Sequence, residues 1–404
     1  MKNKDISLKS IVFIHPFLLP FHYSRMQTLM NTCQSAGISL HNIALAGAYN
    51  DYKWFFTNEK VQSDNLILFP NQSFENIPKD RMWISLKKKL EEFQPDVIFI
   101  YGYSLNVMRR AKSWAASHGA AIALISDSNE FDKKRNGVSE YIKSLYVSGM
   151  DAAFVGGTSS SLYIQKLGIP EVRIVMGYDV VDNEFFCRQA QLTRVMKTQA
   201  QQKWNLPENY FLFVGRLIKE KNLHRLLEAY GSYAKTQTRP WSLVICGDGP
   251  DRQELQDFAA KLPGQLIKNI LFYGHIKQPE IIDFYSYAAC LVLPSVSETW
   301  GLVVNEAMAC SLPILVSNQC GCAADLVAND CNGWRVDPTS GNQLTELMIK
   351  MSTLNASTRI QMGLNSEEII AQWGLDTFAR NAIECAEIAI DHRNQKRVNK
   401  NGSN

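Results

Sequence analysis

The chain has 404 residues, of which 46% are hydrophobic and 20% are charged, and its formal net charge is +3. This length predicts two globular domains, and this charge is far too small for a dedicated nucleic-acid-binding protein. The nine cysteines are an odd number without regular spacing, which favours reduced thiols and a cytoplasmic protein over a disulfide-stabilised secreted one.

Apolar runs in the chain are too short for a membrane span. The run at 11–19 contains His15 and Pro16, and no other run approaches the roughly 20 apolar residues that a spanning helix needs. Three basic clusters, Lys87–Lys89, Arg109–Lys112 and Lys133–Arg135, are either solvated helix faces or contacts for anionic lipid head groups. We therefore expect a cytoplasmic protein, with peripheral contact at the inner face of a membrane as an open alternative.

Short apolar strands alternate with helices through the first half of the chain. Strands are predicted at Ser10–His15, Leu40–Ala46, Leu66–Phe69, Pro95–Tyr101, Ala121–Ser126, Asp151–Val155 and Val172–Met176, and helices at Tyr23–Gly37, Ile84–Phe93, Arg109–His118 and Ser159–Leu167. This alternation predicts an α/β domain with a doubly wound parallel sheet, which we place at residues 1–190.

The alternation stops at Arg188–Pro207, a polar stretch typical of a linker or a linker plus helix. It then restarts, and we place a second domain at residues 200–375. Strands are predicted there at Tyr210–Val214, Trp241–Cys246, Ile270–Tyr273, Leu291–Pro294 and Pro313–Val316, and helices at Asn222–Tyr230, Arg252–Leu262, Ile281–Tyr287 and Trp300–Cys310. A last helix is expected at 376–395 and a disordered tail at 396–404.

Four glycine-bearing turns follow strands of the second domain. The first, Gly215–Asn222, places Arg216 and Lys221 near the start of a helix, which suits a diphosphate. A plain strand–turn–helix with solvated charges is the alternative. The turns at 247–250, 274–275 and 318–323 are weak signals individually. Because the carboxyl ends of parallel strands meet at one edge of a sheet, we expect all four turns to converge on one crevice.

Two carboxylates lie near the same expected edge. Glu298 is in the loop after the strand Leu291–Pro294, and Glu306 is about two helical turns further on. An acid/base pair is one interpretation. With Arg216 and Lys221 at the same crevice, hydrogen-bond acceptors for the hydroxyls of a phosphorylated ligand are the favoured one.

Together these motifs resemble the retaining glycosyltransferases of family 4. The resemblance rests on the segments Gly215–Asn222 (GRLIKEKN), Gly247–Pro250 (GDGP) and Ser297–Ala309 (SETWGLVVNEAMA), and it covers about residues 200–340 strongly and the first half only loosely. It implies the GT-B fold, in which two Rossmann-like domains face each other across a deep cleft and the C-terminal domain holds a nucleotide-sugar. It also implies that the last helix crosses back to the N-terminal domain.

The resemblance assigns roles to individual residues. Arg216 and Lys221 would hold the donor diphosphate and neutralise the leaving group, Glu298 would face the donor sugar, and Glu306 would bind the ribose hydroxyls. Further donor contacts would come from Gly215, Asn222, Gly247, Gly249, His275, Ile276, Thr299, Gly301 and Leu302.

The implied reaction moves a sugar from a UDP- or GDP-sugar to a hydroxyl of a glycan or lipid-linked acceptor, in polysaccharide or glycolipid assembly. Retention would come from front-face attack. No cofactor and no metal ion are expected, since side-chain cations replace the metal and no D-x-D motif occurs in the donor half. A metal site of Cys320, Cys322 and Cys331 is disfavoured because a fourth ligand with suitable spacing is missing.

The acceptor half departs from the family pattern. In place of a Gly-Gly turn after the first strand it has His15, followed by Tyr23 and Arg25, which could line the acceptor cleft or stabilise the helix start. In place of a histidine after the strand Ala121–Ser126 it has Ser126 and Asp127, which act either near the anomeric centre or as capping residues. Two other functions stay open: a nucleotide-sugar 2-epimerase-like GT-B enzyme and a non-catalytic nucleotide-sugar-binding subunit.

Overall fold

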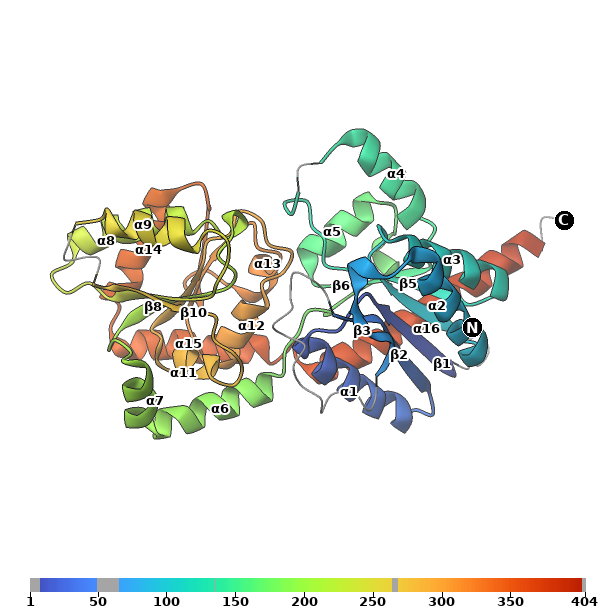
Figure 1. The fold of residues 1–404 in the computed structure, drawn as a ribbon, viewed down its shortest axis with the longest axis horizontal. Coiled ribbons are helices and arrows are strands. Elements are labelled where there is room, and N and C mark those ends of the chain that lie inside the picture. Colours follow the sequence, from blue (N-terminus) through green and yellow to red (C-terminus); the bar gives the residue numbers. More distant parts are fainter. Residues whose placement is uncertain (1–7, 49–64, 134, 264–267, 402–404) are drawn as a thin grey trace. The chain divides into compact units, whose positions relative to one another are not determined.

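A computed structural model describes residues 8–48, 65–133, 135–263 and 268–401 (Figure 1). The chain forms two compact units. Unit 1 comprises residues 1–128, 135–180 and 375–404, and unit 2 comprises residues 129–134 and 181–374. The first boundary therefore lies at Val180, before the predicted position at residue 190.

Unit 1 is built on a seven-stranded parallel sheet with the strand order β3-β2-β1-β4-β5-β6-β7. Its strands are β1 Ser10–His15, β2 Ser39–Ala48, β3 Leu66–Ser73, β4 Val97–Tyr101, β5 Ala121–Ser126, β6 Ala152–Val155 and β7 Ile174–Met176. Its helices are α1 Pro20–Ser35, α2 Lys79–Phe93, α3 Asn106–His118, α4 Gly137–Val147, α5 Thr158–Lys166 and α16 Leu375–Asn401. The predicted doubly wound α/β fold is confirmed.

The central strands of this sheet are apolar along their whole length because helices cover both faces. In β1 the side chains of Ile11–Ile14 are fully buried, and in β4 those of Val97–Ile100. Phe13 of β1 stacks on Phe99 of the adjacent β4, with ring centroids 4.2 Å apart. Continuous apolar runs of this kind explain why β1 and β5 match their predicted bounds.

Unit 2 contains a six-stranded parallel sheet with the strand order β10-β9-β8-β11-β12-β13. Its strands are β8 Tyr210–Val214, β9 Ser242–Cys246, β10 Ile270–Gly274, β11 Cys290–Leu293, β12 Ile314–Ser317 and β13 Gly333–Val336. Its helices are α6 Asn183–Val195, α7 Lys197–Trp204, α8 Leu223–Thr236, α9 Arg252–Ala260, α11 Ile281–Tyr287, α12 Leu302–Ala309, α13 Ala323–Leu326, α14 Gly341–Thr353 and α15 Ala356–Ile370. The sequence analysis missed β13.

The stretch Arg188–Pro207, predicted as a linker or a linker plus helix, is mostly helical, since α6 and α7 cover it. Helix α6 packs within unit 2 through buried Phe186 and through the Arg194 guanidinium, which donates to the Ser286 carbonyl oxygen (3.0 Å). Helix α4 was not predicted. The tail expected to be disordered from residue 396 continues α16 to Asn401, and residues 402–404 lie outside the described part.

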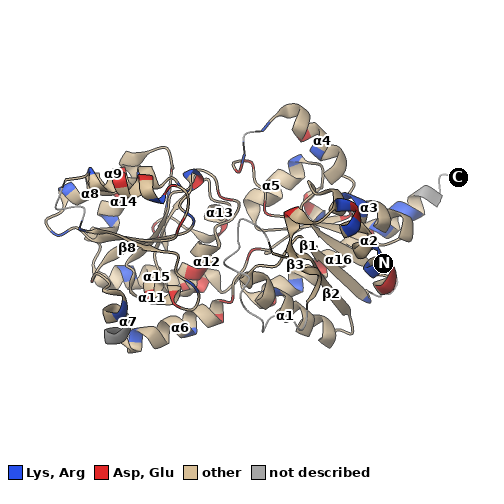
Figure 2. Ribbon diagram, viewed as in Figure 1, with Lys and Arg blue, Asp and Glu red and all other residues tan. Residues whose placement is uncertain are grey.

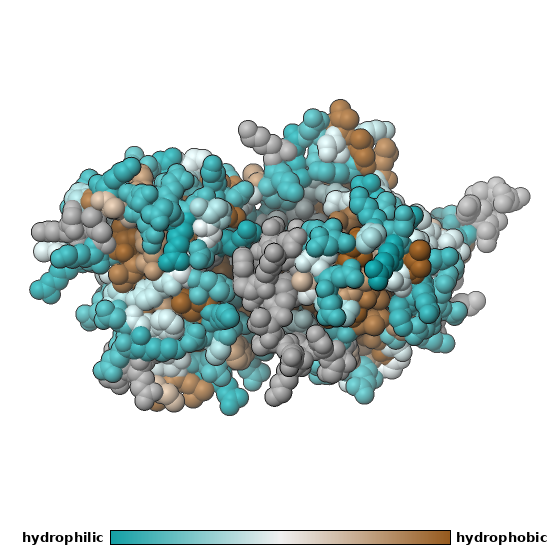
Figure 3. Space-filling model, viewed as in Figure 1, coloured by the Kyte–Doolittle hydropathy of each residue, from teal (hydrophilic) through white to brown (hydrophobic). Residues whose placement is uncertain are grey.

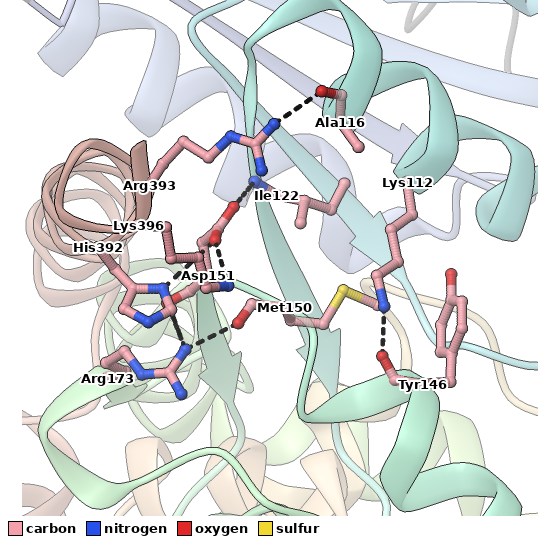
Figure 4. Close-up of polar contacts among 10 residues, drawn as sticks. All are labelled: Lys112, Ala116, Ile122, Tyr146, Met150, Asp151, Arg173, His392, Arg393 and Lys396. Atoms are coloured by element: carbon pink, nitrogen blue, oxygen red, sulfur yellow. Dashed lines mark hydrogen bonds and ion pairs between the residues drawn. The ribbon is translucent and has the colours of Figure 1, made fainter. Parts of the chain in front are cut away.

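The last helix is fastened to the amino edge of the unit 1 sheet by a buried carboxylate (Figure 4). Asp151, just before β6, accepts hydrogen bonds from the Ile122 backbone N–H (3.0 Å) and from Lys396 Nζ (3.1 Å). His392 Nδ1 lies 3.3 Å from the same carboxylate. Towards the other end of α16, the ring of Phe378 packs on Phe154, with centroids 5.4 Å apart. These contacts, together with apolar packing, assign α16 to unit 1.

Among the helices in the described ranges, none combines the length and the apolar character needed to cross a membrane.

Candidate functional site

Three of the four glycine-bearing turns of unit 2 are hydrogen-bonded to one another at the carboxyl edge of its sheet. The Gly215 N–H donates to the Cys246 carbonyl oxygen (3.0 Å), and the Gly247 N–H donates to the Gly274 carbonyl oxygen (2.7 Å). The Leu217 N–H donates to the Asp248 carbonyl oxygen (2.9 Å). The turns after β8, β9 and β10 therefore lie side by side, as their positions after parallel strands predict.

Close backbone approach explains the glycines in these turns. A Cβ at Gly247 would lie 1.8 Å from the Gly215 carbonyl oxygen, and one at Gly249 would lie 2.3 Å from the Leu217 carbonyl oxygen. Gly247 also has φ +156°, which side-chain-bearing residues rarely adopt. The site residues of the first two turns are thus held by a backbone arrangement that only glycine permits.

The fourth turn, after β12, supports the loop that carries Glu298. The Gly321 N–H donates to the Glu298 carbonyl oxygen (3.1 Å), and a Cβ at Gly321 would lie 1.8 Å from the Thr299 carbonyl oxygen. On another side, Asn129 Nδ2 donates to the carbonyl oxygens of Glu298 (3.0 Å) and Thr299 (3.2 Å). Asn129 belongs to the short segment 129–134 of unit 2. No local motif pointed to Asn129, because its partners are far away in the sequence.

The structure brings Lys221 and Glu298 into direct contact. Lys221 ends a 3-10 turn after β8, and its ammonium group pairs with the Glu298 carboxylate. Their side chains are only 16% and 15% exposed. Arg216, partly buried, lies five positions earlier in the same turn, directly after Gly215. Lys221 and Glu298, both predicted to bind the sugar donor, are therefore in contact and partly buried.

Asn222 has a structural task in this turn. It adopts the left-handed conformation (φ +57°), and its Nδ2 donates to the carbonyl oxygens of Pro294 (3.1 Å) and Pro338 (2.8 Å). These bonds tie the turn after β8 to the end of β11. The side-chain amide of Asn222 thus stabilises the fold, and its predicted donor contact stays a prediction.

Glu306 lies in α12, partly buried, and accepts a hydrogen bond from the Tyr285 hydroxyl (2.7 Å). Burial raises the pKa of Glu306 to about 7, and the hydrogen bond from Tyr285 partly opposes that rise. Helix α12 begins at Leu302, after Gly301, which has φ +105°. The first N–H groups of a helix have no partner within it, so this start can meet an anion. Sequence analysis missed Tyr285.

His275 and Ile276 follow β10 directly, at the same edge of the sheet. His275 is exposed; partial burial and nearby Lys277 lower the pKa of its ring, and Asp248 partly offsets this. The ring is therefore neutral at pH 7. The position of His275 and Ile276 at this edge agrees with the predicted nucleotide contact, which stays a prediction.

On the acceptor side, His15 ends β1 and Ser126 ends β5, so both lie at the carboxyl edge of the unit 1 sheet. His15 is fully buried, and burial lowers the pKa of its ring to about 3, with a further contribution from Arg25. Its ring lies 5.0 Å from that of His22, and neither of its nitrogens has a hydrogen-bond partner among the described residues. His15 is therefore a neutral, enclosed side chain.

Arg25 does not line a surface. Its side chain has no exposed area, its Nε donates to the Val180 carbonyl oxygen (2.9 Å), and its guanidinium lies 3.5 Å from Asp179 Oδ1. It also lies over the ring of Tyr178, 5.0 Å from the centroid. Burial raises the pKa of Asp179 to about 7, although Arg25 opposes the rise. The prediction that Arg25 lines the acceptor cleft is thus replaced by a role in holding the chain at 178–180.

The remaining acceptor-side candidates are less enclosed or already bonded. Tyr23, on α1, is partly buried. The Ser126 hydroxyl accepts from the Ser128 N–H (3.3 Å), as a capping residue would. Asp127 accepts from the Tyr101 hydroxyl (3.4 Å), and its carbonyl oxygen accepts from Ser160 (3.0 Å). Of these three, only Asp127 has a carboxylate, and its side chain is partly buried.

All nine cysteines are free thiols, and Cys320 and Cys322 are buried. Within the described ranges, no three His, Cys, Asp or Glu side chains are grouped so that they could hold a metal ion.

Comparison with known proteins agrees with this geometry. Residues 196–368 match the family model described as glycosyl transferases group 1. An uncharacterized glycosyltransferase of Methanocaldococcus jannaschii is 25% identical over 184 residues, which are 46% of each chain. The alpha-monoglucosyldiacylglycerol synthase of Acholeplasma laidlawii is 34% identical over 105 residues, 26% of each chain. The matched part thus spans less than half the length of these relatives.

Solved structures extend the likeness in fold to nearly the whole chain. A glycosyltransferase from Rickettsia africae superposes with a TM-score of 0.74 at 15% identity, covering 95% of this chain and 99% of that one. The Anabaena protein HepE, solved in complex with UDP, has a TM-score of 0.72 at 14% identity, covering 93% and 98%. The two parallel-sheet units therefore have the GT-B fold of glycosyltransferases, and residues 196–368 carry the sequence pattern of the glycosyl transferases group 1 family.

Proposed function

We propose that the chain is a retaining glycosyltransferase of family 4 that transfers a sugar from a UDP- or GDP-sugar to a hydroxyl of a glycan or lipid-linked acceptor. The observation that carries this proposal is the contact between Lys221 and Glu298 beside the glycine turns of unit 2. It is supported by the family model over residues 196–368 and by the UDP complex of a protein with the same fold.

Lys221 and Arg216 supply the charge that the reaction needs. When the bond between the sugar and the diphosphate breaks, negative charge develops on the leaving phosphate oxygen. Preorganised cations at that oxygen are worth about 3–4 kcal/mol, or a factor of 10²–10³ in rate. Arg216 and Lys221 lie in one turn whose backbone is held by Gly215 and Gly247. They would perform the task that a divalent ion performs elsewhere, so we propose a reaction without a metal.

Glu298 is better suited to orient the donor sugar than to attack it. Its carboxylate is paired with Lys221, and an ion pair lowers the nucleophilicity of a carboxylate. When the donor diphosphate pairs with Lys221, the Glu298 carboxylate can accept hydrogen bonds from sugar hydroxyls. Retention then follows from front-face attack by the acceptor hydroxyl, which transfers its proton to the departing phosphate oxygen as the bond to the anomeric carbon forms.

Glu306 and Tyr285 form the proposed ribose subsite. A ribose diol donates hydrogen bonds, so it stabilises the ionised form of Glu306, whose pKa is raised to about 7 in the free protein. The Tyr285 hydroxyl already fixes one carboxylate oxygen (2.7 Å). The second oxygen would accept from the diol.

A lipid-linked acceptor is supported by helix α4 of unit 1. Val138, Tyr141, Ile142 and Leu145 are 71%, 65%, 62% and 61% exposed. Their spacing puts them on one helical face, which appears as a brown area over α4 in Figure 3. Such a face suits the interface between head groups and acyl chains.

Cations lie next to this face. Figure 2 shows basic segments on α3, where Arg109 and Lys112 approach the ring of Tyr146, on α4, at 5.9 and 4.1 Å from its centroid. Basic groups beside an apolar stripe attract anionic lipids. We therefore propose that a cytoplasmic enzyme contacts an anionic membrane surface through α4.

Two experiments test the proposal. Purified protein with EDTA should release UDP or GDP from one of UDP-glucose, UDP-galactose and GDP-mannose, and should form an axial (retained) product linkage with diacylglycerol or oligosaccharide acceptors, as seen by NMR. Donor binding without turnover across all acceptors would favour the binding-subunit alternative instead.

For the surface contact, co-sedimentation should be strong with phosphatidylglycerol vesicles and weak with phosphatidylcholine vesicles. Ile142→Ser should reduce it, whereas Ile360→Ser, an equally exposed residue on α15 (64%), should not. Equal losses in the two variants would contradict a role for α4.

A further inference from the structure

Unit 1 contains a pocket of about 720 Å³ at the amino edge of its sheet, the edge opposite to His15 and Ser126. It lies among the C-terminal ends of α2 and α3, the starts of β4 and β5, and the last turns of α16. The side chains that matter are Gln94, Asp96, Trp114, His118, Arg393 and Arg397. Its volume is in the range of small-molecule sites, and all of its lining residues belong to unit 1.

Two guanidinium groups line this pocket. Arg393 donates through Nη2 to the Ala116 carbonyl oxygen (2.9 Å; Figure 4), but its buried Nε has no acceptor among the described residues. Arg397 lies against Gly119, where a Cβ would be 2.0 Å from its Nη2. Capping the last carbonyls of α3 would use few of the five N–H donors that each arginine has. The donors that these carbonyl oxygens do not use are available to an anion in the pocket.

Trp114 adds a buried donor. Its side chain is 6% exposed, and its indole N–H finds no acceptor in the described part of the chain. The ring of His118 stacks on it, with centroids 4.2 Å apart and an angle of 9° between the planes. A buried donor without an acceptor costs free energy unless a ligand or water supplies one. Trp114 is thus a pocket-lining residue whose buried donor is unsatisfied.

Asp96 adds a carboxylate to the pocket, opposite in charge to the two arginines. Its Oδ2 accepts from the backbone N–H groups of Lys9 (2.8 Å) and Ser10 (2.9 Å), so the carboxylate is fixed in place. A fixed carboxylate attracts hydroxyl groups and repels a second anion. Glu91, which also lines the pocket, adds a second carboxylate. A ligand that suits these groups therefore has an anionic end for the arginines and a neutral, hydroxyl-bearing body for the two carboxylates.

We propose that this pocket binds a small phosphorylated sugar, at a site separate from the donor site of unit 2. Two arginines favour a phosphate because it offers three terminal oxygens and up to two negative charges, whereas a single carboxylate offers two oxygens and one charge. Because Arg393 lies next to His392, the ligand would also hold α16 in the contacts that surround Asp151.

Calorimetric titration of the full chain with glucose 6-phosphate, glucose and inorganic phosphate tests this inference. Glucose 6-phosphate should bind at least about tenfold more tightly than glucose or inorganic phosphate. Arg397→Gln should weaken it about tenfold, as expected for lost charged hydrogen bonds, and Trp114→Phe should weaken it severalfold. Arg380→Gln, an exposed arginine on the same helix, is the matched control and should bind normally.

Indole N–H resonances give a local readout that distinguishes this site from the donor site. The resonance that disappears in Trp114→Phe should shift when glucose 6-phosphate is added to the unaltered protein, and it should still shift in Lys221→Ala. Absence of saturable binding, equal affinity for inorganic phosphate, or binding lost in Lys221→Ala but kept in Arg397→Gln would each overturn the proposal.

Discussion

The polar residues at the carboxyl edges of the two sheets differ in burial and in pairing. In unit 2 the Lys221 ammonium and the Glu298 carboxylate are partly exposed and form an ion pair. They lie beside turns whose backbones approach each other closely because they contain glycine. In unit 1, His15, His22, Arg25 and Asp179 are enclosed, and three ring nitrogens of the two histidines have no hydrogen-bond partner in the described ranges. In the proposed function the unit 2 pair exchanges its internal partner for a ligand, whereas the enclosed groups of unit 1 hold their own chain together.

This difference separates effects on activity from effects on stability. Changes at the unit 2 edge should affect turnover more than folding, and changes in the enclosed unit 1 cluster should do the reverse.

The largest effect on stability is expected from Arg25→Met. It removes the charge beside buried Asp179 and the bond to the Val180 carbonyl oxygen. Breaking a buried pair costs about 3–5 kcal/mol, and we expect the lower end because Asp179, with its pKa raised to about 7, can take up a proton. Urea unfolding measures the change. Exposed Arg380→Met is the control, and similar stability of the two variants would contradict the structural role of Arg25.

A smaller effect is expected from Gly247→Ala. The added Cβ would lie 1.8 Å from the Gly215 carbonyl oxygen, so the turns must separate, at a cost of more than about 1 kcal/mol and with weaker donor binding. Gly37→Ala is the comparison, since Gly37 also has positive φ (+72°) but nothing within 4 Å of the added atom. It should lose about 1–2 kcal/mol, the cost of the left-handed backbone alone, and bind donor normally. Equal donor affinity in both variants would mean that the turn spacing does not form the site.

The smallest effect is a pH dependence from Glu306. Its pKa is raised from 4.5 to about 7, so its contribution to stability is fully present below pH 4.5 and is lost as the pH rises through 7. Donor affinity should instead increase with pH, because the ribose diol donates hydrogen bonds to the ionised carboxylate of Glu306. UDP-glucose affinity should increase up to about tenfold from pH 6 to pH 8, and the increase should be absent in Glu306→Gln. An identical pH profile in that variant would exclude Glu306 from the ribose subsite.

The sequence was sufficient for most of the fold and for part of the site. Strands such as β1, β5 and β8 match their predicted bounds because continuous apolar runs end at turn residues. Lys221 and Glu298 were predicted from short local motifs, and the structure brings the two side chains into contact. Helix α4 was not predicted, although Val138, Tyr141, Ile142 and Leu145 have the spacing of an amphipathic helix.

Contacts between distant segments could not be predicted. Asn129 supports the Glu298 loop from a segment 169 positions away, and Arg25 meets Asp179 across 154 positions. Tyr285 meets Glu306 only because α11 and α12 belong to the same unit. A single sequence contains no local pattern for such pairs.

The most direct test of the central claim compares Lys221→Ala with Lys219→Ala, two lysines of the same 3-10 turn, of which Lys219 is exposed. Turnover with nucleotide-sugar in EDTA should fall by a factor of about 10²–10³ in Lys221→Ala and stay near normal in Lys219→Ala, with unfolding midpoints unchanged in both. Near-normal turnover in a folded Lys221→Ala would contradict the account.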